Sequence, residues 1–145
     1  MFSPVAFIIR KNPPLAVIER VWGTETWIVN DTIHSYCGRM LKVNKGLMCS
    51  SHYHREKQET LYLFDGLVHI EADDVKEVLY PGESITIPSN RWHRFFGLRD
   101  SMMFDSSNLY NQDDIVRRSE SGTFDLDELL RQVGLIGGVN ERFER

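Results

Sequence analysis

The chain has 145 residues, of which 41% are hydrophobic and 26% are charged, and its formal net charge is −4. These values are typical of a soluble globular protein and allow one sizeable core. The acidic balance argues against binding of a nucleic-acid backbone as the main task. No apolar run approaches the length of a membrane span. We therefore expect neither a nucleic acid nor a membrane as a partner.

The start of the chain, residues 1–14, has a short apolar patch without a basic leader before it or a long apolar core after it. This pattern does not resemble a secretion signal, and we expect a cytoplasmic protein. The two cysteines, Cys37 and Cys49, do not form a Cys-x-x-Cys pair. Reduced core thiols are therefore expected rather than a disulfide.

Short apolar or alternating stretches, each bounded by turn residues, recur along most of the chain. The alternation is clearest in residues 36–43, where Arg39, Leu41 and Val43 share one face. Near the start of the chain, residues 7–9 are a candidate for a first strand, and residues 15–21 for another strand or an edge segment. In chain order, the other predicted strands cover residues 26–29, 36–43, 47–54, 59–64, 67–71, 75–79, 84–87, 92–96 and 101–105. About nine or ten short strands at intervals of roughly 8 to 12 residues predict an all-β barrel or jelly roll. We expect a single domain over residues 1–145.

A helical pattern follows near the C-terminus. Asp125 is a suitable N-cap, and Glu128 stands three residues later. The apolar residues fall on one helical face, at Leu126, Leu129, Leu130 and Val133. The pattern predicts a short amphipathic helix over residues 125–133, packed on the barrel or on a second subunit, with Gly134 as its stop.

One short stretch carries the clearest chemical pattern. His52 and His54 flank Tyr53, and alternate side chains of a strand point to opposite faces, so both imidazoles are expected to point the same way. Glu59 from the next strand and His93 from a later one complete a set that suits one divalent metal. The pair of histidines alone is weak evidence, because surface strands carry such pairs by chance.

The spacing of these residues resembles the two sequence motifs of the cupin superfamily. The first motif is matched by Gly46, His52, His54, Glu59 and Gly66, and the second by Gly82, Pro88 and His93. The resemblance implies a cupin β-barrel, a double-stranded β-helix or jelly roll, with a metal held by the three histidines and the glutamate.

Two positions of the second motif differ from the usual cupin pattern. Asn90 stands where a glycine is usual, and Gly97 stands where an asparagine is usual. Asparagine is among the few residues that accept a left-handed backbone conformation. We therefore expect the turn at Asn90 to form.

Three further stretches resemble the cupin domain of the type II mannose-6-phosphate isomerases. They are Trp22-Gly23-Thr24-Glu25, the strand from Tyr36 to Val43, and Asp113-Asp114-Ile115-Val116-Arg117. The resemblance covers about residues 20–118 and extends to D-lyxose isomerase-like proteins. It implies a sugar or sugar-phosphate isomerase that works by metal-assisted proton transfer. In the mannose isomerase motif, however, the glutamate stands closer behind the second histidine than the four-residue gap found here.

Several residues near the motif are candidates for this chemistry. Nitrogen and oxygen ligands favour Mn, Fe, Zn, Ni or Co over Mg or Ca. Glu59, if it is loosely bound, or Tyr62 is the expected proton-transfer group, although a buried tyrosine with one hydrogen bond is the commoner case. The predicted substrate-binding residues are Lys42, Lys57, Arg91 and Trp92. Arg91 or Lys42 would meet a phosphate or carboxylate, while solvated surface charges are the alternative.

Two other functions fit the same residues. A non-catalytic cupin would bind a sugar or another effector and be stabilised by it without turnover. An iron-dependent dioxygenase uses similar ligands and would consume oxygen with Fe(II). In each case the expected partner is a sugar-like or other small molecule. Cupins often pair through β-strands, so the resemblance also implies a homodimer.

Overall fold

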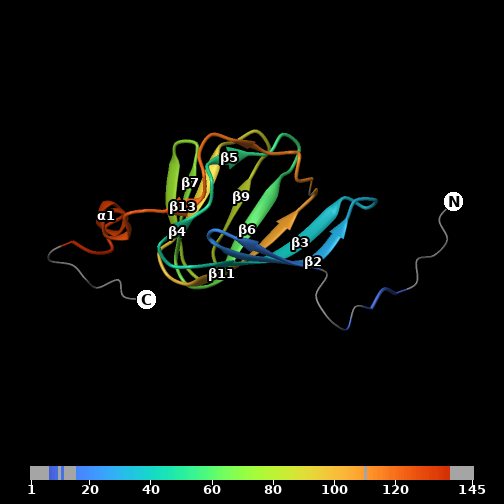
Figure 1. Ribbon diagram of the computed structural model, residues 1–145, viewed down its shortest axis with the longest axis horizontal. Coiled ribbons are helices and arrows are strands. Elements are labelled where there is room, and N and C mark those ends of the chain that lie inside the picture. The colour runs from blue at the N-terminus through green and yellow to red at the C-terminus, as the bar shows by residue number, and fades with distance from the viewer. Residues whose placement is uncertain (1–6, 10, 12–15, 110, 138–145) are drawn as a thin grey trace.

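The computed structural model describes residues 7–9, 11, 16–109 and 111–137. Within these ranges the chain forms thirteen strands and one short helix. The strands build two antiparallel sheets that face each other, and the helix lies outside them at one end (Figure 1). This is an all-β jelly-roll barrel, as the sequence predicts.

The first sheet contains six strands, which include the long ones. In spatial order they are β1 (Ala16–Arg20), β2 (Gly23–Asp31), β3 (Tyr36–Val43), β11 (Ser101–Ser107), β6 (Glu59–Asp65) and β9 (Ser84–Ile87). Neighbours along the chain pair at β1–β2 and β2–β3, whereas β11 inserts between β3 and β6. Residues far apart in sequence therefore meet on the inner face of this sheet.

The second sheet is made of shorter pieces. Its main path is β12 (Val116–Arg117), β5 (His52–Tyr53), β10 (His93–Gly97), β4 (Leu47–Met48) and β13 (Gly122–Thr123). The hairpin of β7 (Val68–Ala72) and β8 (Val75–Leu79) joins it through β10. Because β10 pairs with both β5 and β4, it holds these two neighbouring pieces of the chain in one sheet.

The strands alternate as a half-buried barrel strand should. On β6, Glu59, Leu61 and Leu63 are buried, while Thr60 and Tyr62 are more exposed. The core between the sheets is mostly aliphatic and includes Leu41, Val43, Leu61, Leu63, Val68, Ile70 and Met103. Burial of these side chains away from water stabilises the barrel.

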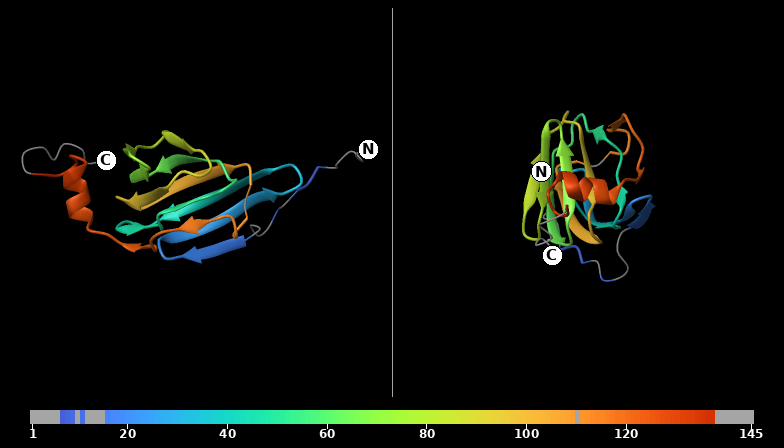
Figure 2. Two further views of the ribbon diagram at one scale, coloured as in Figure 1. Left: turned by 90° about the horizontal axis from the view of Figure 1, so that it is seen from above. Right: turned by 90° about the vertical axis from the view of Figure 1, so that its left-hand side faces the viewer.

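A second apolar cluster lies on the outer side of the second sheet, under helix α1 (Leu126–Gln132). Leu129 of this helix packs with Phe96 and Leu98. The Asp125 carboxylate accepts a hydrogen bond from the backbone N–H of Glu128 and caps the helix. Figure 2 shows the helix against one end of the barrel, so of the two predicted places it takes the one on its own barrel.

The predicted strand over residues 47–54 is divided into β4 and β5. Between them the backbone N–H groups of Ser50 and Ser51 donate to the hydroxyls of Ser121 and Ser119 rather than to a neighbouring strand. Side-chain acceptors thus interrupt the ladder at residues 50 and 51, while the N–H of Cys49 still donates to the carbonyl of Phe95 in β10. Periodicity does not reveal such an interruption, because the acceptors come from a distant segment.

Other element boundaries also differ from the predictions. Residues 7–9 form no strand and are exposed, so that prediction is wrong. Residue 15 lies outside the described residues, and β1 begins at Ala16. Strand β2 runs from Gly23 to Asp31, because pairing with β3 extends beyond both ends of the predicted strand 26–29. The two-residue strands β12 and β13 were not predicted, since so short a run has no period.

The structure explains the two residues of the second motif that differ from the usual cupin pattern, Asn90 and Gly97. Asn90 has a φ of 63°, and its N–H donates to the carbonyl of His54 over 2.6 Å. The expected left-handed turn is therefore formed. At Gly97, a Cβ atom would lie 2.5 Å from the carbonyl oxygen of Asn44, so this strand end requires glycine.

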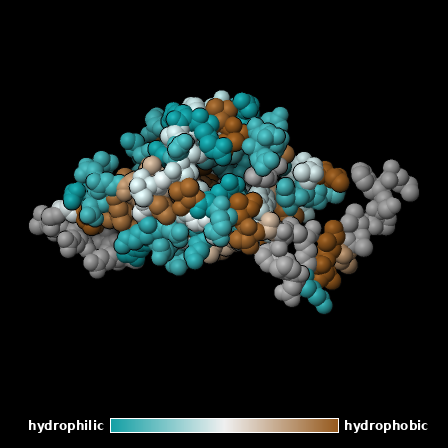
Figure 3. Space-filling view, viewed as in Figure 1, coloured by the Kyte–Doolittle hydropathy of each residue, from teal (hydrophilic) through white to brown (hydrophobic). Residues whose placement is uncertain are grey.

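The surface and the cysteines fit the sequence-based expectations in part. Cys37 and Cys49 are both free and buried, as predicted. Figure 3 shows a largely hydrophilic face with separate hydrophobic patches. Among the described residues, no helix has the length and apolar character needed to cross a bilayer. The cytoplasmic location and the homodimer stay predictions.

Candidate metal centre

Four predicted metal ligands meet inside the barrel. His52 lies in β5, His54 directly follows it, Glu59 begins β6, and His93 begins β10. His52 and His93 are directly opposite each other in the β5–β10 pair. One ligand atom from each of the four residues lies within 4.8 Å of the other three. Tyr53 points to the other side, where its ring contacts Trp92.

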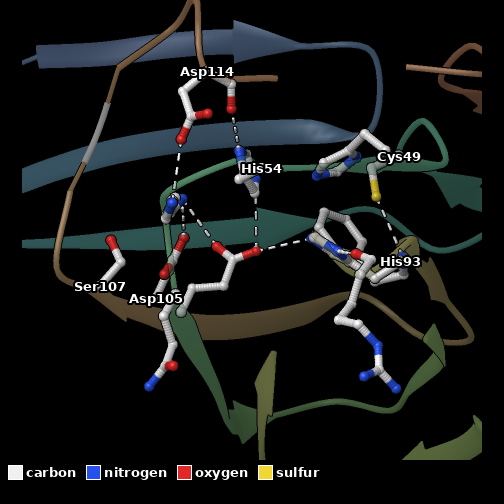
Figure 4. A network of polar contacts seen from close by, with 12 residues as sticks. Cys49, His54, His93, Asp105, Ser107 and Asp114 are labelled. Carbon is white, nitrogen blue, oxygen red and sulfur yellow. Dashed lines mark hydrogen bonds and ion pairs between the residues drawn. The ribbon is translucent and has the colours of Figure 1, made fainter. Parts of the chain in front are cut away.

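Each imidazole is oriented by a hydrogen bond from its Nδ1 atom to a backbone carbonyl. The acceptors are the carbonyl oxygens of Ser50 for His52 at 2.7 Å, Asp114 for His54 at 2.9 Å and Arg91 for His93 at 2.9 Å. A carbonyl oxygen only accepts, so each Nδ1 carries the proton. The Nε2 atoms are left for the centre of the site, which is how metal-binding histidines are usually oriented. Figure 4 shows His54 and His93 converging from two elements.

The donor atoms fit a divalent transition metal. His54 Nε2 is buried with no hydrogen-bond partner among the described residues, and it lies 3.8 Å from Glu59 Oε1. Leaving a buried polar atom without a partner costs free energy, and a metal ion would remove that cost. Burial and the nearby His93 lower the pKa of His52 to about 3. His52 is therefore neutral, which is the form that binds metals.

The contact between His93 and Glu59 indicates that the site favours a positive charge beside Glu59. His93 Nε2 lies 2.9 Å from Glu59 Oε1. Burial opposes a charge on His93, but this contact raises its pKa above the ordinary value. Without a metal, a proton on His93 supplies the positive charge that the glutamate requires.

The second oxygen of Glu59 faces a buried lysine. Lys57 Nζ lies 2.9 Å from Glu59 Oε2 and 3.3 Å from Asp105 Oδ2, and the Lys57 side chain is only 2% exposed. Although burial opposes it, Lys57 holds the pKa of Glu59 well below its usual range. Glu59 therefore presents one oxygen to the imidazoles and the other to a cation, an arrangement that favours a single-oxygen metal ligand.

Arg39 connects this pair to two further carboxylates. Its guanidinium donates to Asp105 Oδ2 over 2.7 Å and lies 2.9 Å from Glu25 Oε1. Arg20 pairs with the same Glu25 oxygen at 3.1 Å. Burial and the charge of Glu59 raise the pKa of Asp105 to about 6. The site thus includes a buried ionic network that the sequence did not predict, although a charged Arg39 on an apolar strand face was a visible signal.

Asp114 explains the longer gap between His54 and Glu59. Its carboxylate accepts from the backbone N–H groups of Arg55, Glu56 and Lys57 at 2.8, 3.1 and 3.2 Å. Its carbonyl accepts from His54 Nδ1 (Figure 4). One residue therefore orients the candidate ligand His54 and also shapes the loop that brings Lys57 beside Glu59.

The ligands line a cavity of about 340 Å³. Its wall also contains the apolar side chains of Trp22, Leu41, Leu61 and Phe95, and the charged side chains of Arg20, Glu25 and Arg39. Asn111, Gln112, Asp113 and Arg117, which are exposed, line its outer part. The cavity therefore leads from solvent to the four candidate ligands.

Two residues that the sequence placed at the site lie on strand faces that point away from it. Tyr62 is 37% exposed and lies on the face of β6 opposite to Glu59, against the ring of Phe64. Lys42 is exposed on β3 between buried neighbours Leu41 and Val43. Neither side chain lines the cavity. Tyr62 cannot transfer a proton at the site, and Lys42 cannot contact a ligand there.

Three other predicted substrate-binding residues also lie outside the cavity wall. Arg91 is exposed and pairs with Asp73. Trp92 packs against Tyr53 on one side, while the guanidinium of Arg118 lies 4.2 Å from its ring. Lys57 is at the site, but it lies behind Glu59 rather than in the wall.

Comparison with known proteins identifies the fold family. Residues 39–103 match the family described as "Cupin domain". This chain carries a cupin domain. The cupin prediction made from the two motifs is therefore confirmed, and the matched range includes all four predicted metal ligands.

Individual relatives are distant. Protein SchB of Streptomyces halstedii is 28% identical over 86 residues, a segment that covers 59% of this chain and 60% of that protein. KdgF from Halomonas sp. is 20% identical, with a TM-score of 0.57, over 62% of this chain and 81% of its own. Pac13 of Streptomyces, described as a nucleoside dehydratase, is 14% identical, with a TM-score of 0.65, over 82% of this chain and 98% of its own.

A further structural neighbour is an RmlC-like cupin from Shewanella frigidimarina. It is 20% identical, with a TM-score of 0.61, over 68% of this chain and 86% of its own. Such identities establish the shared fold and not a shared reaction. The finer resemblance to mannose-6-phosphate isomerases still rests on the sequence stretches alone.

Proposed function

We propose that this cupin domain is a metal-dependent enzyme acting on a small sugar-like molecule by proton transfer, as an isomerase does. The metal would be one divalent ion of Mn, Fe, Zn, Ni or Co, held by His52, His54, Glu59 and His93. The observation that carries the proposal is the convergence of three carbonyl-oriented imidazoles and one glutamate oxygen within 4.8 Å at the buried end of a cavity. When bound, such an ion supplies a Lewis acid that polarises a carbonyl group.

Glu25 is our candidate for the group that moves the proton. It is a buried carboxylate of the cavity wall and does not belong to the ligand set. Arg20 and Arg39 both contact its Oε1 atom, so its position is fixed. Glu59, the sequence-based candidate, is less free, because one of its oxygens faces the imidazoles and the other faces Lys57. A base must reach the reacting proton, and Glu25 lines the cavity without being one of the proposed ligands.

The test is a proton-exchange screen. The protein is reconstituted with each of the five metals and incubated in D₂O with aldoses, ketoses and their phosphates. We expect one sugar to take up deuterium next to its carbonyl with the wild-type protein but not with Glu25→Gln, which should keep its metal. Glu19→Gln, an exposed change on β1, is the matched control. Bound metal without exchange in any sugar would contradict the proposed reaction.

A binding role without turnover is the second candidate. One observation favours it: Glu25 and Glu59 are both held in ion pairs with cations, so neither carboxylate is free of a partner in the cavity. This role predicts that a sugar raises the melting temperature without any exchange. The same ligands also suit Fe(II), and oxygen uptake with Fe(II) would identify dioxygenase activity.

A further inference from the structure

We propose that the ligand of this cavity is an anionic sugar derivative and that Arg117 binds its carboxylate or phosphate group beside the metal centre. The inference rests on the proposed function, because the metal ligands form the other end of the same binding site. In this role Arg117 takes the place of Lys42 and Arg91, the anion-binding candidates from the sequence, which lie outside the cavity.

The position of Arg117 follows from strand register. Strand β12 pairs antiparallel with β5, and Arg117 is directly opposite His52, while Val116 is opposite Tyr53. Directly opposed residues of an antiparallel pair share one face of the sheet. Arg117 therefore lies on the same face as the metal ligand His52, and its side chain lines the cavity.

Arg117 differs from the other two arginines of the cavity wall in its partners. Arg20 and Arg39 are held by Glu25, and Arg39 also by Asp105. Arg117 is exposed, and across the described ranges its side chain forms no ion pair or hydrogen bond. Its planar fork of donors is therefore available for a carboxylate or phosphate, the groups that arginine binds best.

The charge of the cavity also favours an anion. The carboxylates at the site are balanced by cations: Glu25, Glu59 and Asp105 against Arg20, Arg39 and Lys57. A divalent metal and Arg117 would then add three positive charges, an excess that the carboxylates of Asp113 and Asp114 offset only in part. An anionic ligand would compensate this excess in a partly buried site.

The size and lining of the cavity suit one sugar unit. A volume of about 340 Å³ lies near the lower end of small-molecule sites, which span roughly 300 to 1,000 Å³. The amides of Asn111 and Gln112 can bind hydroxyl groups, and Trp22 and Phe95 offer apolar surface for the C–H face of a ring. A polymer would not fit inside this space.

The test compares three sugars that differ only at carbon 6: D-glucose, D-glucuronate and D-glucose 6-phosphate. Dissociation constants are measured by calorimetry on metal-loaded wild-type protein, Arg117→Gln, Arg117→Lys and the exposed control Arg91→Gln. Metal content is measured before any sugar is added. We expect at least one anion to bind about tenfold or more tightly than D-glucose, as a charge-assisted pair predicts. Glucuronate and the phosphate separate the two sources of negative charge.

The variants identify the residue responsible. Arg117→Gln should lose the preference for the anion and keep its metal, Arg117→Lys should keep part of it, and Arg91→Gln should keep all of it. Equal binding of D-glucose and the anions, no binding of either anion, or an unchanged preference in Arg117→Gln would overturn the inference. Failure of the wild-type protein to hold metal would instead overturn the proposed function.

Discussion

The inside of the barrel has a polar end and an apolar end, and the same strands supply both. Their inward-facing residues change from charged to aliphatic along each strand: Glu59 to Leu63 on β6, Arg39 to Val43 on β3, and Asp105 to Met103 on β11. The apolar end is an ordinary core. The polar end combines a buried ionic network with the predicted metal ligands.

The two ends contribute to stability in different ways. Each buried leucine of the apolar end stabilises the fold by about 1.5–3 kcal/mol. Buried ion pairs contribute little net stability, because removing charges from water costs as much as their attraction returns. The polar end is therefore best explained by binding, and it tolerates burial only while every charge keeps a partner.

The largest effect should come from breaking the network at Lys57. Lys57→Met removes the cation that lies 2.9 Å from Glu59 Oε2 and leaves only Arg39, at 3.8 Å, beside that oxygen. The free energy of unfolding of the metal-free protein should therefore fall by about 3–5 kcal/mol. Urea denaturation measures this change. The control is Lys42→Met, an exposed lysine on β3, which should change little. A loss below about 1 kcal/mol in Lys57→Met would mean that the network is not required.

A change at the apolar end should separate stability from metal binding. Leu63 is fully buried, and Leu63→Ala should lower the free energy of unfolding by about 2–5 kcal/mol through lost burial and a cavity. Its metal stoichiometry should equal that of the wild type. Loss of metal at temperatures where the variant is still folded would show that the two ends are not independent.

A change at His52, which is only half-buried, should instead weaken metal binding and leave stability nearly unchanged. His52→Ala removes one of four ligands and should weaken metal binding by at least about 100-fold, beyond the usual effect of residues that merely support a ligand. Its metal-free stability should change by about 1 kcal/mol. Competition with a chelator gives the affinity. Unchanged affinity would remove His52 from the metal set.

The smallest effect is expected outside the barrel. Asp125→Ala removes the cap of α1 and should cost about 1 kcal/mol of stability. Asp127→Ala, in the first turn of the same helix but without the capping bond, should cost less. Thermal denaturation compares them. A change in metal affinity in Asp125→Ala would show an unexpected link between the helix and the site.

The sequence predicted that the four candidate ligands would come together, because motif spacing and strand alternation are local properties. The same alternation explains two errors, since Tyr62 is three residues after Glu59 and must face away from it, and Lys42 lies between two inward residues. Asp105 and Arg117 were missed for another reason. Their place at the site depends on which distant strands pair and in what register, and a single sequence does not contain that register.

X-ray absorption at the metal edge tests the central claim most directly. The protein is reconstituted in turn with Mn, Fe, Co, Ni and Zn, freed of excess metal, and analysed for content and coordination. We predict about one ion per chain with three imidazole nitrogens and a carboxylate oxygen in its first shell. Absence of bound metal after every reconstitution, or an ion with fewer than three imidazoles, would contradict the account.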